Sequence, residues 1–157
     1  MCFGRTYLLY SESLNDGETR MTVEDRAKYR VVSAEICRDG KYLISQRSMK
    51  AVLPLLWEFP GGRVRDGETD HDVLQNSLKS RIGVDATIGQ MVMEVTHEYQ
   101  GYDLMMCVYQ CDIGGQVPTP RRVHDVAWIG PEEFGEYAFP GADQKSVDAL
   151  LGRSGLE

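Results

Sequence analysis

One segment of the chain, from Asp70 to Ile82, carries the local signals of an amphipathic helix at both ends and along one face. Thr69 or Asp70 is suited to cap its N-terminus, and Gly83 directly follows its last residue. At 100° per residue its apolar positions form one narrow stripe, which consists of Leu74, Leu78 and Ile82. The stripe has to face a core, so the rest of the fold must supply a surface that covers this helix.

The segments around this helix are strand-like. Residues 29–37 and 41–47 are rich in β-branched and aromatic residues and flank Arg38-Asp39-Gly40, so they predict a hairpin. Further strands are predicted at 86–99, 102–113 and 123–129, and further helices at 131–137 and 143–151. Strands interrupted by helices predict an α+β domain with a mixed sheet and helices on both faces.

The chain has the length and composition of one globular domain. It has 157 residues, of which 42% are hydrophobic and 26% are charged, which excludes a disordered or fibrous chain. The 24 acidic residues against 17 basic ones give a net charge of -7, which argues against general nucleic-acid binding. No stretch approaches the ~18 apolar residues of a membrane span, and the N-terminus lacks a signal-peptide pattern.

The cysteines predict neither disulfides nor a zinc site. None shows CxxC spacing; they are Cys2, Cys37, Cys107 and Cys111. We expect reduced cysteines, mostly in the core of a cytoplasmic protein.

The first 28 residues differ from the rest. Met21 is a second possible start, while residues 7–10 are strand-like. We therefore expect an N-terminal arm at 1–28 that adds an edge strand or contacts a homodimer partner or another protein. The main domain is expected at 29–157.

A glycine pair opens the most informative motif. Gly61-Gly62 follows Pro60 and marks a backbone that turns tightly or approaches another group closely. Glu68 follows Gly62 after five residues, and Leu78 and Gly83-Val84 come at matching distances. This pattern resembles the Nudix box of the MutT-type hydrolases, G-x5-E-x7-R-E-U-x-E-E-x-G-U, in which U is aliphatic.

Three more blocks extend the resemblance over residues 29–151: Gln46-Arg47, Leu56-Trp57-Glu58-Phe59-Pro60 and Phe139-Pro140-Gly141-Ala142-Asp143. The likeness is greatest to enzymes acting on cytidine or oxidised purine nucleotides. It implies a Nudix fold, an α/β/α sandwich with a mixed central sheet. It also implies that the ligand is a nucleotide or another phosphate-containing small molecule.

The catalytic half of the box does not match. Asn76-Ser77 stands where the family has Arg-Glu, Ser80-Arg81 where it has Glu-Glu, and a further family glutamate falls at about Arg122. In the family these glutamates hold Mg²⁺ or Mn²⁺, hard cations that need carboxylate oxygens. Serine is a weak neutral ligand and arginine repels a metal. We therefore expect a pseudoenzyme that uses no cofactor and has lost the catalytic residues of the family.

Other carboxylates are candidates to replace the missing ones. Glu68 occupies a box position and is the one weak catalytic candidate. Glu98 and His97 lie on a strand that passes close to the site in this fold, so they are candidates to hold one metal with Glu68. Mg²⁺ or Mn²⁺ is a cofactor only in that case. The remaining candidates are Asp70, His71, Asp72 and Glu94; acids in a first helical turn commonly stay solvated.

The binding half is better preserved. The expected ligand-binding residues are Arg47, Phe59, Gly61, Gly62, Arg63, Arg81, Arg122 and Asp143. By resemblance, Asp143 reads a base edge, with an N-cap of the last helix as its rival role, and Arg47 reaches the phosphates or the base. Phe59, Tyr29 or Tyr102 offers a stacking face or belongs to the core.

Arg81 has two readings. With Arg122, Lys79 and Arg63 nearby, its guanidinium can donate charge-assisted hydrogen bonds to phosphate oxygens in place of a metal. Alternatively, Arg81 is a solvated cation at a helix C-terminus.

Three functions therefore remain open. The protein is a nucleotide-binding pseudoenzyme, a divergent pyrophosphohydrolase with relocated metal ligands, or a protein-interaction scaffold.

Overall fold

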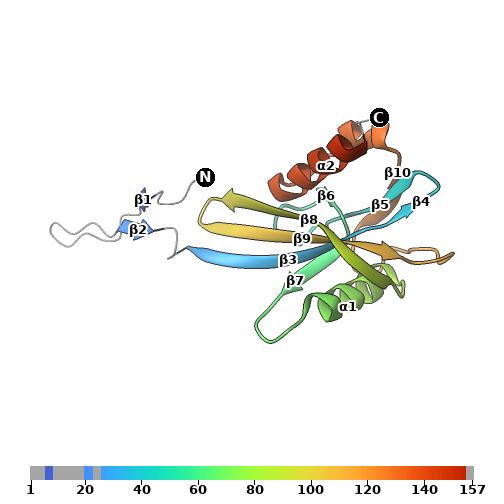
Figure 1. The fold of residues 1–157 in the computed structure, drawn as a ribbon, viewed down its shortest axis with the longest axis horizontal. Helices are drawn as coiled ribbons and strands as arrows, with labels where there is room; N and C mark the ends of the chain where they lie inside the picture. Colours follow the sequence, from blue (N-terminus) through green and yellow to red (C-terminus); the bar gives the residue numbers. More distant parts are fainter. Residues whose placement is uncertain (1–5, 9–19, 23–25, 155–157) are drawn as a thin grey trace.

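The computed structural model describes residues 6–8, 20–22 and 26–154 of the chain. Its elements in chain order are β1 (Thr6–Leu8), β2 (Arg20–Thr22), β3 (Ala27–Glu35), β4 (Cys37–Arg38), β5 (Lys41–Gln46), β6 (Trp57–Glu58), β7 (Gly61–Val64), α1 (Asp70–Ile82), β8 (Thr87–Tyr99), β9 (Tyr102–Asp112), β10 (Asp125–Ile129), the 3₁₀ helix η2 (Pro131–Glu136) and α2 (Gly141–Ser154). The helices α1 and α2 lie on opposite sides of the strands (Figure 1).

Two sheets form the middle layer. One has the order β7-β3-β9-β8, and the other has the order β10-β5-β4 with β6 paired to β5. The strands β3 and β9 are parallel, while β3–β7 and β8–β9 are antiparallel. The predicted mixed sheet between helices is confirmed.

The predicted hairpin is wrong for most of its first strand. Only β4 pairs with β5, through Cys37 opposite Tyr42 and Arg38 opposite Lys41. The chain leaves the first sheet at Ile36, and β3 spends its hydrogen bonds on β7 and β9 instead. Local sequence predicts the turn, where Asp39 and Gly40 have φ of 52° and 77°. It does not show that the preceding strand is long enough to join another sheet.

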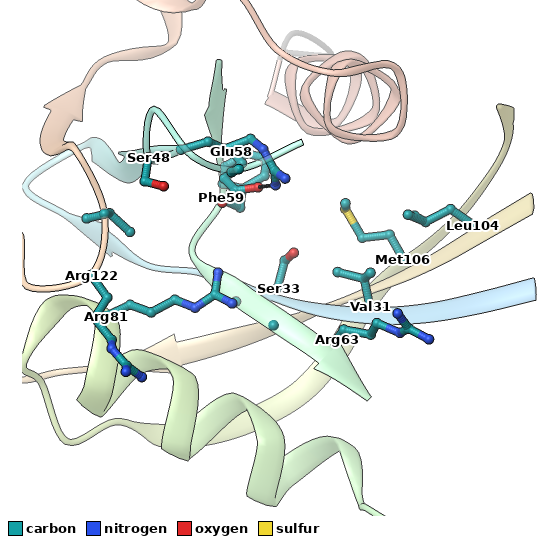
Figure 2. Close-up of a pocket in the computed structure, with 15 residues that line it drawn as sticks. Val31, Ser33, Ser48, Glu58, Phe59, Arg63, Arg81, Leu104, Met106 and Arg122 are labelled. Atoms are coloured by element: carbon teal, nitrogen blue, oxygen red, sulfur yellow. Dashed lines mark hydrogen bonds and ion pairs between the residues drawn. The ribbon is translucent and has the colours of Figure 1, made fainter. Parts of the chain in front are cut away.

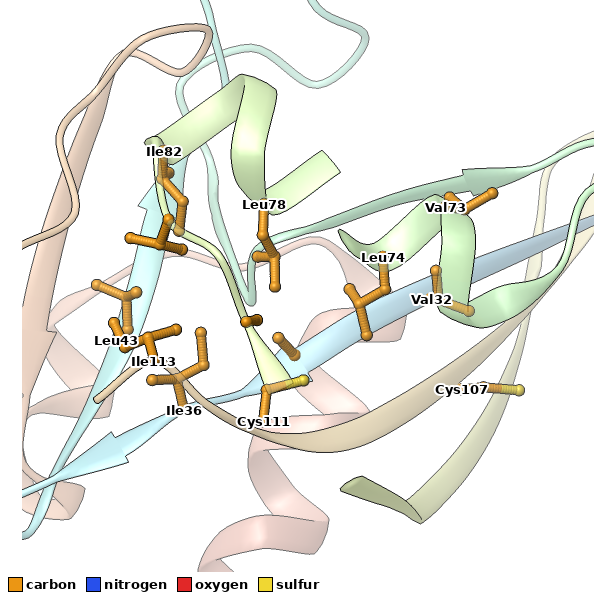
Figure 3. Packing of buried hydrophobic residues seen from close by; sticks show 13 residues of the cluster. Val32, Ile36, Leu43, Val73, Leu74, Leu78, Ile82, Cys107, Cys111 and Ile113 are labelled. Atoms are coloured by element: carbon orange, nitrogen blue, oxygen red, sulfur yellow. The ribbon is translucent and has the colours of Figure 1, made fainter. Parts of the chain in front are cut away.

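The helix α1 begins and ends as predicted. The Thr69 side chain accepts a hydrogen bond from the Asp72 amide at 3.1 Å, and Gly83 closes the helix with φ of 72°. Its apolar stripe is fully buried, with Leu74, Leu78 and Ile82 each 0% exposed. The stripe packs over Val32, Ala34 and Cys107 of the sheet, as Figure 3 shows in part.

Gly62 lets α1 approach β7, and Gly61 lets the backbone of β3 approach the same strand. A Cβ on Gly62 would overlap Ser77 Oγ and lie 3.2 Å from Ser77 Cβ, and one on Gly61 would overlap the Val32 carbonyl oxygen. The predicted close approach is confirmed, and it presses the face of α1 that carries Ser77 against the strand after Phe59.

The opposite face of the same sheet meets α2. Because side chains alternate along a strand, Met106 and Val108 point away from α1 and contact Ala142 of α2. A second cluster joins α2 to the other sheet; its buried members are Ile44, Phe59, Ile129, Phe134, Val147 and Leu150.

The expected N-terminal arm is described only in part. The strands β1 and β2 pair with each other, with Thr6 opposite Thr22. The rest of residues 1–25 lies outside the described residues, so the arm's partner stays a prediction. Cys107 and Cys111 are buried as expected, whereas Cys37 is exposed, and Cys2 also lies outside the described residues. Neither α1 nor α2 has the length and apolar character that a membrane crossing requires, as far as the described chain goes.

Candidate functional site

Two adjoining cavities form one groove on the α2 side of the first sheet. Their volumes are about 420 and 360 Å³. The residues common to both are Val31, Arg47, Glu58, Arg63, Leu104 and Met106. We call the larger cavity the arginine end and the smaller one the tyrosine end. Figure 2 shows the arginine end, with Arg81 and Arg122 on the side opposite Leu104 and Met106.

A buried carboxyl group lines the tyrosine end. Asp143 lies in the first turn of α2, is 4% exposed, and its Oδ1 has no hydrogen-bond partner among the described residues. Burial raises the pKa of Asp143 well above its usual range, and the nearby Glu58 carboxylate raises it further. Because α2 begins at Gly141, Asp143 is not its N-cap, and the rival role expected from the sequence is wrong.

Glu58 and Arg47 form an ion pair between the two ends. Arg47 Nη1 donates to Glu58 Oε1 at 2.8 Å, and both side chains are largely buried. Burial raises the pKa of Glu58, while Arg47 opposes that rise. We assign the negative charge to Glu58, which faces a guanidinium, and the proton to Asp143, which lacks a cationic partner of its own. Arg47 also donates from Nε to the Val52 carbonyl at 2.8 Å, so it fixes the loop beside the groove.

Three tyrosines form a wall of the tyrosine end. The rings of Tyr99 and Tyr102 are stacked with centroids 5.0 Å apart, and Tyr29 lies 5.4 Å from Tyr102 at a tilt. Arg63 places its guanidinium 4.1 Å from the centre of the Tyr29 ring. The hydroxyl of Tyr99 accepts the Ala142 amide at 3.0 Å, which fixes the start of α2 beside Asp143. Tyrosine rings of this kind are able to stack against a planar base.

Arginines line the other cavity. Arg81 comes from the last turn of α1, and Arg122 from the segment that follows Pro120. That segment is tied to the helix end, because the Arg81 carbonyl accepts the amides of Arg121 at 2.9 Å and Arg122 at 3.0 Å. The two arginines therefore enter the cavity from neighbouring backbone.

The residues of this cavity do not fit a divalent cation. Its one carboxylate, Glu58, is already paired with Arg47, and α1 contributes Arg81. Among the described residues, no three or more His, Cys, Asp or Glu side chains are grouped closely enough to hold a metal ion. Mg²⁺ and Mn²⁺ need oxygen donors with negative charge, which this set does not provide.

All the expected ligand-binding residues line the groove, with Asp143 at the tyrosine end and the others at the arginine end. Glu68, by contrast, accepts the Arg65 amide at 2.8 Å outside the groove. The alternative metal set is not brought together, since Glu68, His97 and Glu98 line neither cavity. Lys79 turns away from the arginines and pairs with Asp85 at 3.0 Å.

Sequence reasoning missed Glu58 and Tyr99 as groove residues. The sequence predicted a loop around Pro54 but did not assign it to the groove, which Val52 and Leu53 line. In this loop Met49 and Val52 are exposed, and Leu53 and Leu55 have φ of 57° and 63°. Glu58 was identifiable as a charged residue inside an apolar run. No local rule predicts a left-handed leucine.

The chain is similar in sequence and in fold to known proteins. The sequence model of the NUDIX domain family matches residues 31–149. The CTP pyrophosphohydrolase of Escherichia coli (strain K12) is 31% identical over 122 residues, which covers 77% of this chain and 90% of that protein. An 8-oxo-dGTP diphosphatase of Proteus vulgaris is 33% identical over 76 residues, 48% of this chain and 68% of that protein. The solution structure of the E. coli ORF135 protein superposes with a TM-score of 0.70 at 27% identity, covering 83% of this chain and 94% of that one.

Proposed function

The chain belongs to the NUDIX domain family in its MutT-type form, and on that premise we propose that it binds a nucleoside di- or triphosphate without metal-dependent hydrolysis. The base lies at the tyrosine end of the groove and the phosphates at the arginine end. The protein is then a nucleotide-binding pseudoenzyme. Its ligand-binding residues are those of the groove, and it has no resident metal.

One observation carries the proposal, namely that the two ends of the groove differ in what they offer a ligand. The tyrosine end combines the buried carboxyl of Asp143, whose Oδ1 has no hydrogen-bond partner among the described residues, with a wall of tyrosine rings. The arginine end has guanidinium groups where a metal-dependent hydrolase needs carboxylates. A guanidinium cannot bind a metal or accept the proton of water, so this end supports binding better than turnover.

The tyrosine end also favours particular bases. A protonated carboxyl presents an O–H donor beside a carbonyl acceptor. This pair is complementary to cytosine or adenine, which place a ring nitrogen acceptor beside an exocyclic amine donor. An ionised carboxylate only accepts, which suits the two N–H groups of guanine. Because burial and the Glu58 carboxylate raise the pKa of Asp143, its protonated form is favoured, and this form suits cytosine or adenine.

A melting scan with a nucleotide panel tests the proposal, with product analysis on the same samples. A nucleotide at 100 times its Kd stabilises the fold by about 2.7 kcal/mol, which raises Tm by about 5–10 °C for this length. We expect this rise in EDTA with one or a few nucleotides, and no nucleoside monophosphate product when Mg²⁺ is added. Silence with every nucleotide would support the protein-interaction scaffold instead.

A divergent hydrolase is the second candidate, because the similar proteins named above are a CTP pyrophosphohydrolase and an 8-oxo-dGTP diphosphatase. It requires Mg²⁺ or Mn²⁺ on relocated ligands such as Glu68 and Glu98. Turnover near 1 s⁻¹, within the usual enzyme range, that EDTA abolishes would establish this candidate and overturn the pseudoenzyme.

Base reading has its own test. Asp143→Ala is expected to weaken the preferred nucleotide by about 1–3 kcal/mol more than the others, since it leaves base-edge groups unsatisfied. Asp148→Ala removes an exposed carboxyl from the same helix and serves as the control. Equal weakening of all nucleotides would remove Asp143 from base recognition.

A further inference from the structure

We propose that Arg81, together with Arg122 and Arg63, binds the phosphate chain directly, so that the ligand is the metal-free polyphosphate and divalent cations weaken its binding. This inference rests on the proposed function and deepens it, because it specifies the ionic form of the nucleotide. In a metal-dependent site, by contrast, the cation bridges phosphate oxygens to carboxylates and binding requires it.

The arginine end has an excess of positive charge. The residues that line this cavity include four arginines and one carboxylate, Glu58. The Arg47–Glu58 ion pair cancels one charge of each sign. Among the described residues, Arg63, Arg81 and Arg122 have no ion-pair partner within 4.0 Å. Their positive charge is therefore available to an anion that enters the cavity.

Backbone hydrogen bonds place Arg81 and Arg122 side by side. The backbone of the segment before β10 is hydrogen-bonded to the last turn of α1, through the Arg81 and Ile82 carbonyls. These bonds occupy carbonyl groups that a helix C-terminus otherwise leaves open. They also fix the Arg122 backbone next to Arg81. Figure 2 shows both arginines on one side of the cavity and Arg63 on the other. Oxygens on successive phosphates can meet different guanidinium groups.

Lys79 is a useful comparison for Arg81, because its charge lies at the same helix end but outside the cavity. It lies in the same last turn of α1 as Arg81, and its side chain is 57% exposed. It pairs with Asp85 and does not line the cavity. Arg81 is half-buried, lines the cavity, and lowers the pKa of Glu58 through its charge. The same turn thus holds one solvated cation and one directed into the groove.

The effect of magnesium follows from the donors that are present. Mg²⁺ bound to a triphosphate removes two of its negative charges and occupies oxygens that the guanidinium groups would otherwise contact. A protein carboxylate would compensate by binding that ion, but α1 presents Ser77, Ser80 and Arg81 at the matching positions. The magnesium complex is therefore the poorer ligand.

Calorimetric titration of CTP and of inorganic pyrophosphate in EDTA tests this site. Arg81→Ala is expected to weaken both by about ten- to a hundred-fold, and the loss should shrink at high salt. Lys79→Ala removes one positive charge from the same turn and should change both affinities less than about two-fold. Arg122→Ala, at an exposed position, should weaken both ligands and provides a second variant if Arg81→Ala is poorly folded.

Saturating Mg²⁺ is expected to weaken CTP binding to the wild type several-fold. If CTP binds only with Mg²⁺, or if Arg81→Ala and Arg122→Ala bind as tightly as Lys79→Ala in EDTA, the direct-contact site is wrong while nucleotide binding survives. If neither ligand binds the wild type with or without Mg²⁺, the proposed function fails as well.

Discussion

Replacement of Asp143 by asparagine should stabilise the protein at neutral pH. Burial and the Glu58 carboxylate raise the pKa of Asp143 well above its usual range, and its Oδ1 has no partner among the described residues. The unfolded chain loses this proton near pH 3.9. Above that pH the folded state holds a proton that the unfolded state has released, so stability falls as pH rises until the folded pKa is passed.

The change in the free energy of unfolding with pH gives the size of the expected effect. While Asp143 is protonated only in the fold, each pH unit costs about 1.4 kcal/mol, or about 3–5 °C in Tm for a chain of this length. Asparagine has nearly the same shape and cannot ionise. The stability difference between Asp143→Asn and wild type should therefore grow from about pH 5 upward.

Thermal unfolding of both proteins by circular dichroism between pH 5 and 8 measures this difference. Asp148→Asn, an exposed change on the same helix, is the control and should give a difference with little pH dependence. A difference as flat as that of the control would mean that Asp143 is ionised in the fold, whatever the constant offset between the two proteins. The assignment of its proton and the preference for cytosine or adenine would then be refuted.

Two further predictions concern the elements that build the groove. Gly62→Ala should destabilise the fold by about 1–3 kcal/mol in denaturant unfolding, because its Cβ overlaps Ser77 Oγ, and Ser77→Ala should relieve most of that cost; an unchanged cost in the double variant would contradict the close approach. Asp70→Asn should cost about 1–2 kcal/mol at pH 7, discounted because the Arg30 side chain is 41% exposed. The bond from Arg30, and a smaller one from Tyr109, hold the pKa of Asp70 below its usual value, so this loss should vanish as pH falls through that pKa; a loss that persists there would contradict the ion pair.

Short-range sequence signals were sufficient to predict the elements whose ends and buried face are set by residues within the element itself. The Thr69 cap, the narrow stripe of α1 and the Gly83 stop all act within a few residues of one another. The pairing of β3 with β9 joins residues more than 70 positions apart, such as Val32 and Cys107. No short-range pattern encodes that choice, and the predicted hairpin therefore extended too far back.

In the site, too, the sequence predicted some features and not others. Motif positions predicted which residues line the groove, because the fold brings the residues of these motifs together in space. Spacing did not predict how each residue is engaged. The Lys79 side chain points to Asp85 and not into the cavity that Arg81 lines. The Glu58 side chain is held in the groove by its ion pair with Arg47. Both depend on tertiary contacts.

In the binding mode that we propose, guanidinium groups, and not a metal, receive the phosphates. A crystal structure of the protein grown with CTP and Mn²⁺, recorded with the anomalous signal of manganese, distinguishes these two modes. We predict phosphate oxygens within hydrogen-bond distance of Arg81, about 2.7–3.2 Å, and no manganese peak within about 2.5 Å of a side-chain oxygen of the protein. A manganese ion held between the phosphates and Glu68, Glu98 or another carboxylate would contradict this binding mode.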